Sequence, residues 1–150
     1  KHRTLLVDVK ARIPELTFGR FLSSEQFNIM LQSNFIDGND RGALLEFASA
    51  LKIENGAEIE DNGVSQVATV KTGVATLAKG KVPNPVDLRP YRTFAEVEQP
   101  SSKFVFRIDK NGQMALFEAD GKRWVSDAVS RIADYLKKEL SGEKHITVLS

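Results

Sequence analysis

The sequence predicts an α+β fold, with a mainly antiparallel β-sheet, an N-terminal helix pair and a C-terminal amphipathic helix packed on the sheet. Three observations predict this class. Apolar residues recur at helical spacing in two neighbouring segments near the start, strand-like segments surround Asn-Gly turns, and a long amphipathic segment lies near the end. The 150 residues suit a single domain over residues 1–150. Because the chain begins at Lys1 without a methionine, we expect it to be the C-terminal part of a longer protein.

The first predicted elements are a strand over Thr4–Lys10, which ends before Pro14, and a helix that begins at Ser23. Ser23 is followed three residues later by Gln26, which is the pattern of a capping box. The stripe of this helix that we expect to be buried consists of Phe27, Met30, Leu31 and Phe35.

A second helix is predicted after the turn at residues 37–40. Asp40 is the expected N-cap, and Asn55-Gly56 marks the end of the helix. Its apolar face is expected to consist of Leu44, Leu45, Phe47, Ala48 and Leu51. The short connection predicts that the two helices form a hairpin.

A first β-hairpin is predicted around Asn62-Gly63, between strands at Ala57–Glu60 and Val64–Lys71. A third strand is expected over Val74–Ala78. Gly73 is expected to form a bulge or bend before this strand, and Lys79-Gly80 is expected to form a turn after it.

A second β-hairpin is predicted around Asn111-Gly112. On its first strand, Phe104, Phe106 and Ile108 share one face, which we expect to lie in the core. The second strand is expected to return over Met114–Ala119.

The C-terminal helix is predicted to follow Trp124 and to stop at Ser141-Gly142. Lys137 and Lys138 lie near its end, where positive charge complements the helix dipole. The apolar stripe comprises Val125, Ala128, Val129, Ile132, Ala133, Leu136 and Leu140. A last strand is expected over His145–Leu149.

The sequence predicts a non-enzymatic protein without a catalytic, metal or cofactor site. It has no cysteine, and its two histidines lie near opposite ends of the chain. It contains no HExxH pair, nucleophile elbow, P-loop or dinucleotide-binding fingerprint. No apolar run approaches the ~18 residues that span a bilayer, so no membrane partner is expected.

The proline-rich stretch PNPVDLRPYRTFAEVEQP, residues 83–100, is the predicted partner-binding segment, and we call it the belt. Its prolines restrict the backbone, so that the loop can present side chains at a low cost in ordering. The candidate partner-binding residues are Arg89, Tyr91, Arg92 and Phe94, of which the first three are expected to be exposed. Tyrosine and arginine are enriched among binding hot spots.

Single-stranded nucleic acid is the alternative partner, because aromatic residues beside cations can hold single strands. The cations that this alternative uses are Lys71, Lys79, Lys81, Arg89, Arg92, Lys103 and Arg107. In the competing interpretation, Phe104 and Phe106 form the core face of a hairpin and the cations remain in water. The net charge of +1 gives no overall field that favours nucleic acid.

The stretches VKTGVA, VPNPVDLRPYRTFAEVEQPSSKFVFRI, ALFEADGKRWVSDAV and IADYL resemble uncharacterised phage and prophage proteins, the YfdQ-like prophage family. The resemblance covers most of residues 17–140. It implies a phage or prophage origin, with action in the bacterial host cytoplasm or within a virion. The family provides no established catalytic residues to carry over to this chain.

Together, these observations predict a phage-encoded protein that acts through protein–protein binding or self-assembly as a homo-oligomer. Three alternatives remain open: an accessory single-stranded DNA-binding or recombination helper, a structural component of the virion, and an inhibitor of a host defence factor. If the chain is a DNA-binding helper, its affinity for DNA is expected to fall steeply as the salt concentration rises.

Overall fold

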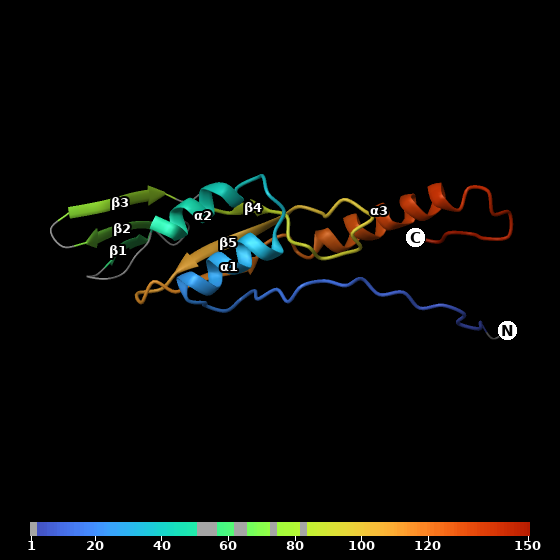
Figure 1. The fold of residues 1–150 in the computed structure, drawn as a ribbon, viewed down its shortest axis with the longest axis horizontal. Helices are drawn as coiled ribbons and strands as arrows, with labels where there is room; N and C mark the ends of the chain where they lie inside the picture. Colours follow the sequence, from blue (N-terminus) through green and yellow to red (C-terminus); the bar gives the residue numbers. More distant parts are fainter. Residues whose placement is uncertain (1–2, 51–56, 62–65, 73–74, 82–83) are drawn as a thin grey trace.

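The fold belongs to the α+β class, as the sequence predicts (Figure 1). The computed structural model describes residues 3–50, 57–61, 66–72, 75–81 and 84–150. In chain order, the elements are α1 (Ser24–Asn34), α2 (Arg41–Ala50), β1 (Ala57–Asp61), β2 (Gln66–Thr72), β3 (Ala75–Lys81), β4 (Val86–Leu88), β5 (Ser102–Ile108), β6 (Met114–Glu118) and α3 (Arg123–Glu139). None of the helices described is both long and apolar enough to cross a membrane.

Helix α1 begins at the predicted capping box. The Ser23 hydroxyl accepts a hydrogen bond from the Gln26 N–H at 3.2 Å, and the Gln26 side chain accepts one from the Ser23 N–H at 3.4 Å. This satisfies two backbone donors that a helix N-terminus otherwise leaves unpaired. The predicted stripe is confirmed, because Phe27, Met30, Leu31 and Phe35 are all buried.

Helix α2 follows a short loop and contributes buried Leu44 and Ala48 to the core. The carbonyl oxygen of Asp40 accepts the Leu44 N–H, as in a residue that precedes a helix. Its carboxylate does not cap α2 but accepts the N–H of Asp87 in β4 at 2.7 Å. This contact ties the start of α2 to the second sheet. The predicted helix end at residues 55–56 lies outside the described residues, as does Leu51.

The first sheet has the antiparallel order β1-β2-β3, and β1 and β2 pair as expected for the predicted first hairpin. The prediction of a turn at Lys79-Gly80 is wrong, because these residues lie within β3 and pair with Thr69 and Ala68. A register irregularity occurs between Val70 and Lys71, while the predicted bulge at Gly73 lies outside the described residues. Asn62-Gly63 also lies outside them.

The second sheet has the antiparallel order β4-β5-β6 and provides the larger part of the core. Burial alternates along β5, which confirms the predicted face of Phe104, Phe106 and Ile108. The turn at Asn111-Gly112 is also confirmed, with Gly112 at a φ of 75°. A positive φ suits glycine because it has no Cβ. Strand β4, within the belt, was not predicted.

The core lies between the helix pair and the second sheet. The ring of Phe106 packs 5.5 Å from that of Phe27 on α1 and 5.9 Å from that of Phe47 on α2. Helix α1 is held at both ends by isolated β-bridges, from Leu22 to Met114 and from Phe35 to Pro90. The belt is therefore joined to the helix pair as well as to the sheet.

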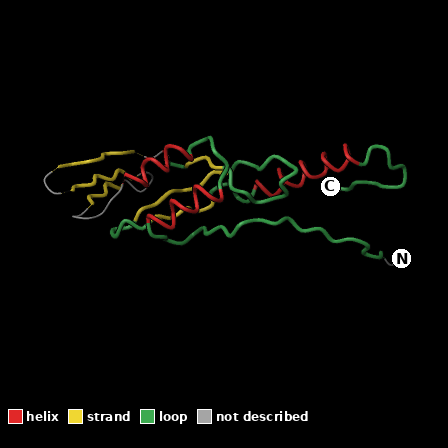
Figure 2. The backbone as a smooth tube through the Cα atoms, in the orientation of Figure 1, coloured by secondary structure: helices red, strands yellow, loops and turns green. Residues whose placement is uncertain are grey.

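The predicted terminal strands at Thr4–Lys10 and His145–Leu149 are wrong. Both segments lie outside regular structure, and Figure 2 shows the N-terminal one as a long drawn-out loop. A strand needs a hydrogen-bonded neighbour, and these segments pair with none of the described strands. Their apolar side chains remain in water: Leu5 is 78% exposed, Leu6 86% and Leu149 80%.

Helix α3 covers most of the predicted C-terminal helix and carries Lys137 and Lys138 in its last turn. It flanks the second sheet from one end, and extends away from the strands (Figure 1). Ala128 and Ala133 are buried, but Val125, Val129 and Leu136 are 41%, 47% and 38% exposed. The described residues therefore bury only part of the apolar stripe of α3.

Candidate functional site

After β4, the belt continues as a loop that leads to β5 and reaches from the sheet to the side of α3 (Figure 1). Helix α3 is fastened to this loop by Arg131, whose Nη1 donates to the carbonyl oxygen of Glu98 at 2.9 Å. The belt is thus bounded by the sheet on one side and by α3 on the other. The described part of the belt comprises residues 84–100.

The shape of the belt loop is set by the buried side chain of Gln99. Its Oε1 accepts the N–H groups of Arg92 and Thr93 at 2.8 and 3.0 Å. Its Nε2 donates to the carbonyl oxygens of Thr93 and Phe94 at 3.2 and 3.1 Å. The side-chain amide of Gln99 therefore holds the end of the loop against its beginning. Both polar atoms of this amide are hydrogen-bonded. This residue was missed from the sequence, because a glutamine has no spacing rule that marks such a role.

Arg92 lies in the interior, so the prediction that it is exposed is wrong. Its residue exposure is 6%, and the guanidinium carbon lies 5.0, 5.2 and 4.6 Å from the ring centroids of Phe18, Phe104 and Trp124. Its Nη2 makes an ion pair with Oε1 of Glu118 at 2.9 Å. Burial removes water from the guanidinium at a high cost in free energy, and the three aromatic rings and the carboxylate compensate for this cost.

The Arg92 guanidinium extends a polar network to the start of α3. Its Nη1 donates to Oγ of Ser102 at 3.2 Å, and that hydroxyl donates to Oδ2 of Asp120 at 2.8 Å. Asp120 in turn accepts the N–H of Lys122 at the N-terminus of the helix. Burial lowers the pKa of Arg92, while Glu118 and Asp120 act in the opposite direction by attraction. One chain of contacts therefore connects the belt, the second sheet and α3.

The other candidate binding residues differ in exposure. Arg89 pairs with Glu98 at 3.2 Å and also donates to the carbonyl oxygen of Gln99, and its side chain is 25% exposed. Tyr91 is 40% exposed, the most of the four. Phe94 is partly buried and faces a cavity described next. The structure thus leaves Tyr91 and Phe94 on the surface, while Arg89 is engaged by the belt itself.

An apolar groove of about 410 Å³ lies between the belt and α3. The belt supplies Phe94, Val97 and the rim residue Glu96, α3 supplies Ile132, Tyr135 and Leu136, and the N-terminal segment supplies Val9. We call residues 3–17 the arm, and this cavity the apolar groove. The groove is of a size that accommodates several side chains of a partner.

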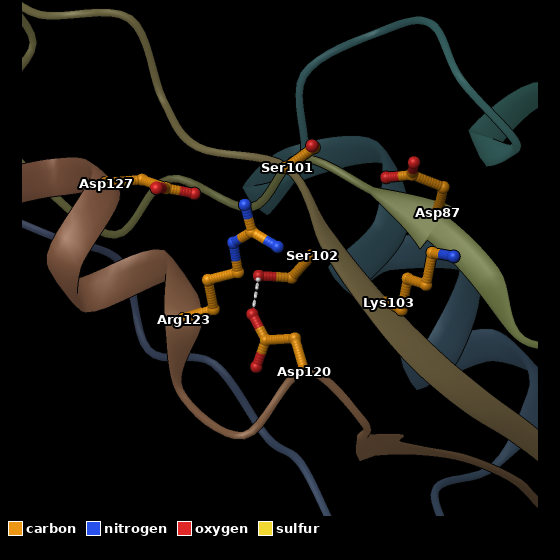
Figure 3. A pocket seen from close by; sticks show the side chains of 7 residues that line it. All are labelled: Asp87, Ser101, Ser102, Lys103, Asp120, Arg123 and Asp127. Carbon is orange, nitrogen blue, oxygen red and sulfur yellow. Dashed lines mark hydrogen bonds between the residues drawn. The ribbon is translucent and has the colours of Figure 1, made fainter.

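A second cavity, of about 430 Å³, lies where β4, β5 and the start of α3 meet (Figure 3). Its polar lining consists of Asp87, Ser101, Ser102, Lys103, Asp120, Arg123 and Asp127. Figure 3 shows Arg123 between Asp127 and Ser102. Charges of both signs face the same space, so the cavity presents no uniform field to an anionic or cationic ligand. Within the described ranges, no three His, Cys, Asp or Glu residues are grouped as metal ligands would be.

Five of the seven cations of the nucleic-acid alternative lie in the two sheets, and Arg89 and Arg92 lie in the belt after β4. Lys71 lies in β2, and Lys79 and Lys81 lie in β3, where only the backbone is described. Exposed Lys103 and half-buried Arg107 lie in β5. Phe104 and Phe106 are both buried in the core, as in the interpretation that competes with base stacking.

Comparisons of this chain with family models, with curated proteins and with solved structures find no match. The candidate site therefore has to be interpreted from its own residues.

Proposed function

We propose that this chain is a non-enzymatic, phage- or prophage-encoded protein that acts by protein–protein binding, with self-association as the principal mode. The observation that carries the proposal is the apolar surface of the arm. Leu5, Leu6, Val7 and Val9 are 78%, 86%, 73% and 67% exposed. Four neighbouring apolar side chains in water are costly for an isolated protein, and such patches mark interaction sites.

A second exposed apolar surface lies along α3. Val125, Val129 and Leu136 are spaced by four and seven residues, so that they lie on one side of the helix. The adjoining side, with Ala128 and Ala133, is already buried within the chain. Only part of the apolar stripe of α3 is buried by the described residues. The part that stays exposed supports contact with another protein surface.

The phage or prophage origin is supported by the sequence resemblance, which also supports action in the bacterial host cytoplasm or within a virion. Self-association suits a structural component of the virion. The absence of any recognised catalytic motif in the sequence supports the non-enzymatic assignment.

Nucleic-acid binding is less well supported than self-association. Arg92 is occupied by Glu118 and three aromatic rings, and Arg89 by Glu98. Lys103 faces a cavity that also contains three aspartates. These contacts compete with phosphates for the same cations, so the affinity for single strands is expected to be low.

The test measures molar mass by light scattering, with and without single-stranded DNA, for the unaltered chain and two variants. Leu5→Asp combined with Leu6→Asp should abolish or strongly weaken association, because both charges would have to be buried in the interface. The control, Thr4→Asp, introduces a charge at a polar neighbour and should leave association unchanged. Adding DNA should not change the mass. A chain that is monomeric alone but gains mass with DNA would instead support the DNA-binding alternative.

A further inference from the structure

The arm borders the apolar groove of its own chain but does not fill it. Val9 lines the groove, whereas Leu5 and Val7 remain more than 70% exposed. In the described part of the chain, no hydrogen bond joins residues 3–14 to any other segment. The groove nevertheless keeps an open volume of about 410 Å³. The arm of the same chain therefore leaves both surfaces largely uncovered.

The spacing of the apolar side chains along the arm suits the apolar lining of the groove. In an extended backbone, alternate side chains point to the same side, so an arm that binds in this conformation would present Leu5, Val7 and Val9 together. The groove offers apolar walls on both of its sides, from Phe94 and Val97 on the belt and from α3 on the other. Three aliphatic side chains at alternate positions are thus complementary to a groove with apolar walls.

The charges of the two surfaces are also complementary. Lys10 and Arg12 follow Val9 on the arm, and both are exposed. Glu96, also exposed, lies at the rim of the groove. Because Lys10 also lies 3.9 Å from Asp8 of the same arm, the attraction rests mainly on Arg12 and Glu96, and it favours one direction of insertion.

Building on the proposed self-association, we infer that the occupant of the apolar groove is the arm of a second copy of this chain. In a reciprocal exchange, Val9 leaves the groove of its own chain, and each arm inserts Leu5, Val7 and Val9 into the groove of its partner. A two-fold axis relates the two contacts. Exchange covers both arms and both grooves, and specific interfaces bury on the order of 1,000 Å² or more. No further copies are required, because the exchange is closed.

Cross-linking between two single-cysteine variants tests this exchange. The chain has no cysteine of its own, so a short bis-maleimide reagent reacts only at the introduced residues. Val9→Cys, carrying a mass-shifting tag, is mixed with untagged Leu136→Cys. The control mixture replaces Leu136→Cys by Lys138→Cys, which lies two residues further on and therefore on the opposite side of α3. Molar mass is measured on the same samples before the reagent is added.

We expect a cross-linked heterodimer with Leu136→Cys and its loss to background with Lys138→Cys. An oligomer that yields no such heterodimer, or that yields cross-links between two Val9→Cys chains alone, overturns the exchange but leaves self-association standing. A monomeric mass overturns both. A heterodimer of equal yield in the two mixtures also overturns the exchange, because it shows contact without a defined position.

Discussion

Two arginines three residues apart on the belt have contrasting surroundings. Arg92 is enclosed by Phe18, Phe104 and Trp124 and paired with Glu118. Arg89 lies at the surface beside Glu98. Their sequence context is similar, so the difference arises from rings that converge from distant segments. Only one of the two is available to a partner without unfolding the belt.

Replacing Arg92 by alanine should lower the free energy of unfolding by about 2–5 kcal/mol, mainly because it opens a space among three rings, whereas the Glu118 side chain is 36% exposed and can be hydrated. Replacing Arg89 by alanine should cost about 0–1 kcal/mol, because its partner Glu98 is 68% exposed. Urea denaturation of the two variants measures the difference. Equal destabilisation would contradict the burial of Arg92. The double variant is unsuitable as a binding test, because Arg92 affects stability.

Phe106 provides an equally local test of the core. Replacing Phe106 by alanine should lower the free energy of unfolding by about 3–5 kcal/mol, because its ring is 2% exposed and contacts Phe27 and Phe47. The control is Phe21→Ala, whose ring is 40% exposed and should cost clearly less. Thermal unfolding measures both. An unchanged Tm for Phe106→Ala would contradict the register of β5.

The helices and strands that the sequence predicted best are those fixed by neighbouring residues. The capping box from Ser23 to Gln26, the alternation along β5 and the Asn111-Gly112 turn each depend on a few positions, and each is confirmed. The strand expected at Thr4–Lys10 depends on a distant partner, and the apolar and β-branched residues of the segment do not supply one. The same reason accounts for the missing strand at His145–Leu149.

The start of α1 gives a test at the level of a single helix. Ser23→Ala should lower the free energy of unfolding by about 1 kcal/mol, because the Gln26 N–H loses its acceptor. Ser33→Ala, at the exposed opposite end of α1, is the control and should have little effect. Denaturant titration of both variants measures the difference. A Ser23→Ala variant as stable as the original chain would show that the capping box does not contribute.

The candidate site was predicted in part. The belt contains β4 and leads directly into β5 of the same sheet, which agrees with the prediction that its prolines and large side chains distinguish it from a flexible linker. The roles of Gln99 and Arg92 were not predicted, because they depend on which backbone groups and rings surround a side chain after folding. The apolar groove was also missed, since it combines the belt, α3 and the arm from three separate segments.

The complete fold joins a well-packed core to apolar surfaces that its described residues do not cover. The core lies between α1, α2 and the second sheet, whereas the arm and the edge of α3 remain in water. Burial of these surfaces in a second copy would remove the cost of exposing them, without any change in the core. The proposed self-association would therefore account for the apolar surfaces that the described residues leave uncovered.

Sedimentation equilibrium of the unaltered chain over a wide range of concentrations tests this account most directly. We predict a molar mass that rises with concentration towards a multiple of the 16.7 kDa chain mass. A dimer is the closed state that arm exchange favours. A mass that stays at 16.7 kDa at every concentration would contradict self-association.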